Sequence, residues 1–201
     1  MKLDVYKNKN GIVDRAVVSK PVWTPHIDLF YETRDLFNDY TIHSTHLDHP
    51  RWRGYKFAGV YVIYFDRKVI YIGRGKSHPD RGVVDRLVDF RGSYLYAVDT
   101  NKYRSLYQNG VYAGKRFGKE GASKITARYM LLGAGDFPSI TRLTERKESI
   151  LISQYVAKYG CLPEFNFDHP NIKHYPDFSH GTLCEENEEI EDESTLEAFF
   201  S

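Results

Sequence analysis

A glycine, a lysine and a serine stand together at Gly75-Lys76-Ser77, and these residue types bind phosphate in nucleotide-binding loops. Such a loop also needs a glycine five positions before the Gly-Lys pair, because its backbone has to wrap around the phosphates. That position is Ile70, inside a run of residues typical of a β-strand. The spacing therefore argues against nucleotide binding and leaves the segment open to other chemistry.

Five features follow one another along the chain: Gly59-Val60-Tyr61, Tyr71-Ile72-Gly73, Arg86, Glu148 and Asn166. Together they resemble the GIY-YIG nuclease family, in which the two tripeptides lie on adjacent antiparallel strands. In that family a following helix carries an Arg and a later helix carries a Glu. The resemblance covers about residues 59–166. The runs "RLVDF", "ESILI" and "LPEFN" are most similar to the restriction-endonuclease branch of the family.

The helical pattern around Glu148 supports a special role for this carboxylate independently. Leu151, Ile152 and Tyr155 follow it at the spacing of one helix face, so Glu148 lies in line with an apolar stripe. A charge at such a position is costly unless it is paired or bound to a metal. The alternative is a Glu at the boundary of the core that reaches solvent or a neighbouring Arg such as Arg146.

The resemblance implies a metal-dependent phosphodiesterase. Glu148 would hold a single Mg²⁺ or Mn²⁺ ion, and Arg86 would stabilise the charge that develops on the phosphate. Tyr61 would act as general base, Tyr71 would position the water or the phosphate, and Asn166 would support the Glu helix or orient the substrate. A phenol, with a pKa of about 10, can be a base near neutral pH only if neighbouring cations favour the phenolate.

Two roles in this scheme have more than one candidate. Arg81 is an alternative to Arg86 as the catalytic arginine. Phe90 stands four residues after Arg86, where many relatives have His or Tyr, so a second proton-handling group is missing at that position. His78 or Lys76 could substitute for it.

The runs "AGVYVIYF" and "KVIYIG" are rich in Val, Ile and Tyr and predict a β-hairpin with its connection near Asp66 and Arg67. Tyr61 and Tyr71 can share one face of this hairpin only if the connection contains an odd number of residues. A two-residue turn would put the two phenols on opposite faces. The alternative for each is a strand tyrosine that packs in or beside the core.

Three helices are expected around the hairpin. Their patterns cover about residues 79–92, 123–132 and 139–159, with helix-start chemistry at Pro79 and a helix-ending glycine at Gly160. Four glycines precede the second of these helices and suggest mobile loops there: Gly110, Gly114, Gly118 and Gly121.

These elements predict an α+β fold in which a small antiparallel sheet is flanked by helices. We expect an irregular N-terminal extension at residues 1–57 and a GIY-YIG-like nuclease domain at 58–168. The domain would contain a basic insertion at 91–128. Residues 169–201 would form a C-terminal segment with an acidic tail whose composition predicts disorder.

The formal net charge of +1 conceals a strong asymmetry. No Lys or Arg follows Lys173, and eight of the 27 acidic residues lie within residues 185–201. The rest of the chain holds 28 basic and 19 acidic residues, a formal charge of +9. Such a balance is typical of a protein that binds a polyanion. The acidic tail could shield this basic body from nonspecific DNA or recruit a partner.

We expect contacts with double-stranded DNA from basic stretches that also carry aromatic residues. The candidates are Arg51, Arg53, Lys56, Arg74, Lys76, Lys115, Arg116, Lys119, Lys124 and Arg128. A solvated basic face with aromatic residues in the core is the alternative.

The layout of a compact domain with an N-terminal extension and a basic insertion resembles the restriction-endonuclease branch. It implies a site-specific endonuclease that cleaves both strands of DNA, as a homodimer at least on DNA, since two cuts usually take two active sites. A phage or mobile-element nicking endonuclease of low specificity is one alternative. A DNA-binding protein without catalysis is another.

Nothing near Met1 resembles a signal peptide, and no apolar run approaches the roughly 20 residues that span a bilayer. We therefore expect a cytoplasmic protein, bacterial or phage-encoded, with no membrane association. Cys161 and Cys184 lack metal-type spacing, and we expect both to be free thiols. Three histidines recur every third residue: His43, His46 and His49. We expect them to be surface or hydrogen-bonded residues, and a second metal site is the alternative.

Overall fold

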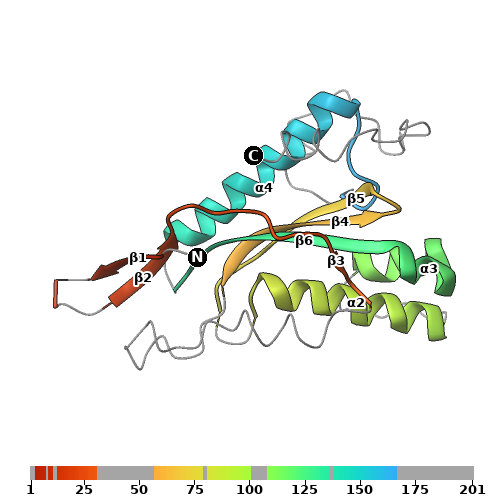
Figure 1. The fold of residues 1–201 in the computed structure, drawn as a ribbon, viewed down its shortest axis with the longest axis horizontal. Coiled ribbons are helices and arrows are strands. Elements are labelled where there is room, and N and C mark those ends of the chain that lie inside the picture. Colours follow the sequence, from red (N-terminus) through yellow and green to blue (C-terminus); the bar gives the residue numbers. More distant parts are fainter. Residues whose placement is uncertain are drawn as a thin grey trace.

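The computed structural model of the chain describes residues 3–7, 9–10, 13–30, 57–78, 81–100, 108–135 and 138–166. Within these ranges the chain forms one antiparallel sheet with helices on both of its faces (Figure 1). The α+β class expected from the sequence is confirmed. Among the described helices, none is long and apolar enough to cross a membrane.

The sheet contains six strands, and all of their pairings are antiparallel. The strands are β1 (Leu3–Lys7), β2 (Val13–Val18), β3 (Ile27–Asp28), β4 (Ala58–Phe65), β5 (Lys68–Gly75) and β6 (Ile125–Ala134). The order is β1-β2-β6-β4-β5, with β3 pairing beside β6. The predicted β4–β5 hairpin is therefore confirmed, and β5 lies at one edge of the described sheet.

The helix predicted over residues 123–132 is wrong, because the central strand β6 occupies this segment. Its sequence, "ITARYMLLGA", is buried at nine of ten positions, since helices cover both faces of the sheet there. A strand buried on both faces loses the alternation of polar and apolar residues, and its apolar run then resembles a buried helix.

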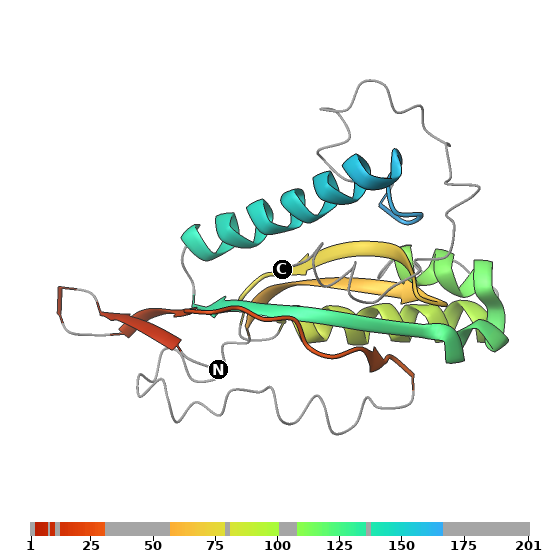
Figure 2. The same ribbon diagram turned by 45° about the horizontal axis from the view of Figure 1, so that its top comes forward.

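The helices are α2 (Val83–Thr100), α3 (Gln108–Gly121) and α4 (Pro138–Tyr159), with a short 3₁₀ turn, η3 (Ala122–Lys124), before β6. Helices α2 and α3 cover one face of the sheet and α4 covers the other (Figures 1 and 2). The sheet thereby separates two apolar cores. Tyr61, Phe90 and Tyr129 belong to the core on the α2–α3 face, and Ile72 and Leu151 belong to the core on the α4 face.

Helix α4 matches its predicted range and ends before Gly160, whose φ of +72° is typical of a helix C-terminus. Helix α2 is longer than predicted, because it continues through Gly92. Its buried stripe runs on from Phe90 to Tyr94 and Ala97, so packing on the sheet outweighs the cost of an internal glycine, about 1 kcal/mol.

Helix α3 occupies the segment for which the glycines predicted mobile loops. A Cβ atom on Gly110 would collide with the carbonyl oxygen of Phe90, and one on Gly114 would lie 2.5 Å from the carbonyl oxygen of Tyr94. The two glycines therefore let the backbones of α3 and α2 approach closely. Residues 91–128, predicted as a basic insertion, supply part of α2, α3 and the start of β6 where the structure describes them.

The N-terminal segment, expected to be irregular, contributes the β1–β2 hairpin. Strand β2 pairs with β6 only through Ala16 with Ala134 and Val17 with Gly133, so the hairpin projects from one end of the sheet (Figure 2). Other predicted features lie outside the described residues: Arg51, Arg53, Lys56, His43, His46, His49, Cys184 and the acidic tail. Cys161 is buried and disulfide-bonded, so the expectation of a free thiol is wrong there, because residue spacing does not reveal spatial approach.

Candidate active site

The β4–β5 hairpin decides whether the two candidate tyrosines meet. Its turn consists of two residues, Asp66 and Arg67, with φ values of 49° and 68°. Positive φ at both positions is what a tight two-residue hairpin turn requires. By the parity argument, this turn alone would put Tyr61 and Tyr71 on opposite faces of the sheet.

A β-bulge in β5 reverses that outcome. Ile63 pairs with Tyr71, but the next residue, Tyr64, pairs with Val69, so Ile70 is an extra residue in β5. The extra residue shifts the alternation by one and returns both candidate tyrosines to the face that α2 and α3 cover. Their ring centroids lie 5.9 Å apart.

Gly73 makes room for the phenol of Tyr61. Tyr61 is fully buried, and its ring extends from β4 over the neighbouring strand. A Cβ atom on Gly73 would lie 2.7 Å from the Tyr61 hydroxyl oxygen and 2.7 Å from Cε1 of Tyr71. Because β5 is an edge strand, the absence of a side chain at Gly73 lets the Tyr61 hydroxyl approach that edge of the sheet.

Asn166 holds this part of β5 in place. Its Oδ1 accepts a hydrogen bond from the backbone N–H of Ile72 at 2.9 Å, and its Nδ2 donates to the Ile72 carbonyl at 2.7 Å. The N–H of Phe165 donates to the Ile70 carbonyl at 2.9 Å. The buried Asn166 amide thus takes the place of a neighbouring strand. It fixes the backbone between Tyr71 and Gly73, and its contact is with β5 rather than with α4.

Glu148 lies on α4, on the opposite face of the sheet from the two phenols. It is buried in line with Leu151 and Ile152, as the helical pattern predicts. Its Oε2 lies 3.4 Å from Nε of Arg74, the residue directly after Gly73. Side chains alternate along a strand, so Gly73 faces the tyrosines and Arg74 faces α4. The phenols therefore lie against Gly73 on one side of the edge strand, and the carboxylate contacts the next residue, Arg74, on the other side.

Arg74 contacts a second carboxylate as well. Its Nη1 lies 3.2 Å from Oε1 of Glu145, which precedes Glu148 by three residues on α4. The sequence placed Arg74 among the DNA contacts and did not single out Glu145. The strand alternation and the i, i+3 spacing of the two glutamates were the signals that could have paired them.

The other candidate arginines lie near the start of α2. Arg86 is half-buried, and its Nη1 lies 3.9 Å from Oδ2 of Asp89 on the same helix. Arg81 is exposed just before α2. Phe90 is fully buried in the core, while Lys76 is exposed after β5. The described ion pairs thus join Glu148 to Arg74, and Arg86 to Asp89.

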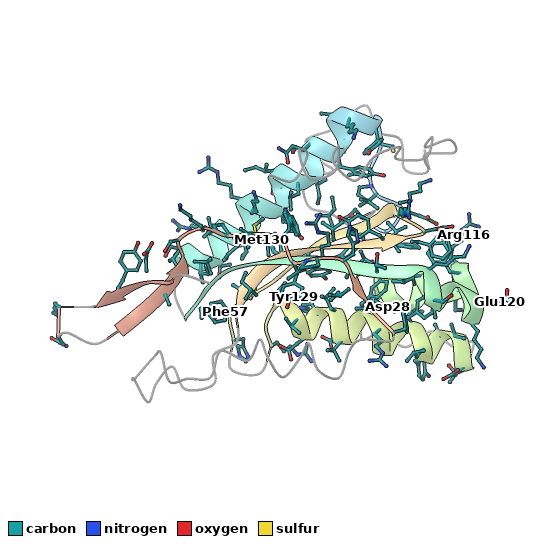
Figure 3. All side chains as sticks on the ribbon, in the orientation of Figure 1. Asp28, Phe57, Arg116, Glu120, Tyr129 and Met130 are labelled. Carbon is teal, nitrogen blue, oxygen red and sulfur yellow. The ribbon has the colours of Figure 1, made fainter. Side chains whose placement is uncertain are left out.

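The predicted DNA contacts within the described ranges divide by exposure. Lys76, Arg116, Lys119 and Lys124 are exposed, and Lys115 is half-buried. Arg116 lies at the end of the sheet where α3 and the β4–β5 turn are found, an end labelled by Arg116 and Glu120 in Figure 3. Lys124 also lies beside this turn, with its Nζ 3.4 Å from Oδ2 of Asp66. Arg128 is buried and donates from Nε to the carbonyl oxygen of Thr24 at 2.8 Å. Arg128 therefore contacts the protein interior, and the remaining candidate contacts are the exposed and half-buried basic residues.

The carboxylate of Glu148 is the kind of ligand that Mg²⁺ prefers. This ion binds oxygen ligands, usually one or two carboxylates together with several waters. The guanidinium of Arg74 lies against both carboxylates, so the site already accommodates positive charge. The described ranges contain no group of three or more His, Cys, Asp or Glu suited to a metal ion. Glu148 fits an ion that keeps most of its waters.

Comparisons of the chain with protein-family models, with curated proteins and with solved structures find no match. The chemistry assigned to the site below rests on the sequence pattern and on the geometry of the described residues.

Proposed function

We propose that the chain is a metal-dependent DNA endonuclease of the GIY-YIG type, most similar to the restriction-endonuclease branch. One observation carries the proposal: Tyr61 and Tyr71 lie against Gly73 on one side of β5, and Glu148 contacts Arg74, the next residue of this edge strand, on the other side. These residues come from distant parts of the sequence. Their approach to one strand edge is what a site assembled from the two tripeptides and the Glu helix requires.

Hydrolysis of a phosphodiester needs an activated water, a sink for negative charge and stabilisation of the departing oxygen. Glu148 would hold Mg²⁺ or Mn²⁺, and the bound ion would supply Lewis-acid stabilisation of the leaving oxygen. Tyr61 would accept the proton of the water at its hydroxyl oxygen, and Tyr71 would orient the water or the phosphate. Arg86 would stabilise the developing charge through its fork of donors.

The charge distribution supports double-stranded DNA as the substrate. The chain without residues 185–201 has a formal charge of +9, and exposed basic side chains lie on α3, on η3 and directly after β5. A basic surface of this kind binds the phosphate backbone whatever its sequence. We propose site-specific cleavage of both strands by a homodimer in the cytoplasm, since each subunit supplies one active site.

The test is incubation of the full chain with Mg²⁺ and long DNA of known sequence, followed by sequencing of the ends. Glu148→Gln should lower the cleavage rate at least about 100-fold, because the ion loses its charged ligand. Glu120→Gln, an exposed change on α3, is the control and should leave the rate unchanged.

The products separate the proposal from its alternatives. Paired cuts at one sequence support the restriction type, whereas scattered single-strand cuts indicate a nicking enzyme. DNA binding by wild-type protein without metal-dependent cleavage would refute the nuclease proposal and leave a DNA-binding protein.

A further inference from the structure

The ion pairs of Arg74 form a graded series from the protein interior to the surface. The side chain of Glu148 is 9 % exposed, that of Arg74 is 26 % exposed and that of Glu145 is 43 % exposed. The guanidinium therefore lies between a buried carboxylate and one that water reaches. The two contacts use different nitrogens, Nε for Glu148 and Nη1 for Glu145.

A buried carboxylate needs a counter-charge, and two glutamates three residues apart on one helix repel each other. Arg74 answers both needs, because a guanidinium has five donors and can bind two carboxylates at once. In the protein without metal, Arg74 is thus a counter-charge in direct contact with Glu148.

A divalent ion bound by Glu148 would need the same carboxylate oxygens. A guanidinium in contact with those oxygens would repel the ion at short range, where partial burial weakens screening by solvent. The ion and Arg74 therefore compete for Glu148. Glu145 offers the displaced guanidinium a second partner, already in contact and closer to water.

We propose that Arg74 is the resident counter-ion of Glu148 and is exchanged for the metal, with Glu145 as the positioning residue that retains the displaced guanidinium. The inference rests on the proposed function in one respect, the assignment of Glu148 as the metal ligand. It adds the direction in which two further residues change the metal affinity.

The experiment measures the affinity of the full chain for Mn²⁺ without DNA, from the free-ion signal in electron paramagnetic resonance. Arg74→Met keeps most of the stem volume and removes the charge, so it should tighten Mn²⁺ binding about 10-fold, the effect of losing one competing charge-assisted contact. Glu145→Gln should weaken binding several-fold, because Arg74 then has Glu148 as its remaining carboxylate partner among the contacts described above.

Two controls define the site. Arg116→Met removes an arginine whose Nε lies 3.4 Å from Glu164, the same separation as in the Arg74–Glu148 pair, and should leave the affinity unchanged. Glu148→Gln should abolish Mn²⁺ binding at this site. Circular dichroism spectra of all variants report whether they fold.

The double variant Arg74→Met/Glu145→Gln separates indirect from direct action of Glu145. If Glu145 acts through Arg74, its substitution has no effect once Arg74 is gone. A weakening of equal size in both backgrounds would make Glu145 a direct metal ligand and overturn its proposed role. If Arg74→Met does not fold, the variants Glu145→Gln and Arg74→Lys carry the test. Arg74→Lys keeps the positive charge, so its Mn²⁺ affinity should stay close to that of the wild type, whereas Glu145→Gln should still bind Mn²⁺ more weakly.

Weaker or unchanged Mn²⁺ binding in Arg74→Met, with binding still lost in Glu148→Gln, would overturn the exchange and leave the proposed function standing. Wild-type protein that neither binds Mn²⁺ nor cleaves DNA would overturn both.

Discussion

Tyr61 and Tyr129 lie opposite each other on β4 and β6, and they form a matched pair of buried phenols on one face of the sheet. The Tyr61 ring extends the other way, over Gly73 at the edge strand. Only Tyr61 is therefore placed by the described contacts to act at that edge. A change to Phe keeps the ring of each residue in the core and removes the hydroxyl.

Tyr61→Phe should lower the rate of Mg²⁺-dependent DNA cleavage about 100-fold or more, the usual contribution of a general base. Tyr129→Phe should leave the rate within a factor of about two or three, since Tyr129 belongs to β6, which β4 separates from β5. Single-turnover cleavage assays at equal enzyme concentration measure both rates. Equal losses in the two variants would remove Tyr61 from the mechanism and attribute the effect to core packing.

At this scale the sequence singled out Tyr61, Tyr71, Glu148 and Asn166, and it could not assign their contacts. The two phenols lie on one face of the sheet because of the bulge at Ile70, and no residue type there predicts a bulge. The contact of Arg74 with Glu148 joins a strand to a helix that is distant in sequence. The sequence therefore identified the candidate residues, and the fold shows which residues they contact.

The α2–α3 contact shows how single atoms set the distance between elements. Gly114 packs against the backbone of α2 at Tyr94, whereas Gly92 lies on the exposed side of α2 with nothing within 4 Å of a Cβ position. Both glycines stand inside helices. Their substitutions separate helix propensity from packing.

Gly114→Ala should lower the free energy of unfolding by about 1–3 kcal/mol, because the added methyl group collides with backbone and α3 has to shift. Gly92→Ala should raise the free energy of unfolding by about 0.5–1 kcal/mol, the gain in helix propensity. Urea denaturation followed by circular dichroism measures both values. Stabilisation by Gly114→Ala would contradict the close approach of the two helices.

Tyr94 joins α2 to the kink of α3. Its hydroxyl donates a hydrogen bond of 2.6 Å to the carbonyl oxygen of Gly118, where φ is +64° and the helix is interrupted. Burial raises the pKa of Tyr94 to about 12, from an ordinary value near 10. The folded protein therefore keeps this proton over a pH range in which the unfolded chain has lost it.

It follows that the contribution of the neutral Tyr94 to stability is complete below pH 10 and is lost as the pH rises from 10 to about 12. Tyr94→Phe should lower the free energy of unfolding by about 1 kcal/mol at pH 8 through loss of the hydrogen bond. The gap between wild type and variant should narrow above pH 10. Denaturation curves at pH 8, 10 and 11 measure the gap, and other tyrosines cancel because both proteins contain them. A constant gap would contradict the raised pKa.

At the scale of elements, the hairpin and α4 were predictable because their patterns are local: a β-rich pair of runs with a short connection, and a long helix with a glycine end. The central strand β6 was not, since burial on both faces removes its alternation. The glycines of α3 misled in another way. These glycines allow close contact with α2, and the sequence of α3 alone does not show that α2 packs there.

Across the whole molecule, positive and negative charges are concentrated in different parts of the chain. The eight acids within residues 185–201 nearly cancel the +9 of the remaining residues. These acids lie outside the described residues, and their charge follows from the sequence. A polyanion such as DNA is attracted by the body and repelled by the acidic segment, and both effects weaken as salt screens them.

A chain truncated after Thr182 should bind nonspecific duplex DNA about 10-fold more tightly than the full chain at 50 mM salt, since eight repelling charges are gone. The difference should shrink towards 300 mM salt, at a Debye length of about 5–6 Å. Fluorescence anisotropy with a labelled duplex measures the affinities.

The matched control is a full-length chain in which the eight acids become Gln or Asn. It should reproduce the truncation if charge is the cause, because its length and every other residue stay the same. Equal affinities and equal salt slopes for all three proteins would mean that the acidic segment does not weaken DNA binding. The +1 formal charge of the whole chain would then not describe the charge of the surface that binds DNA.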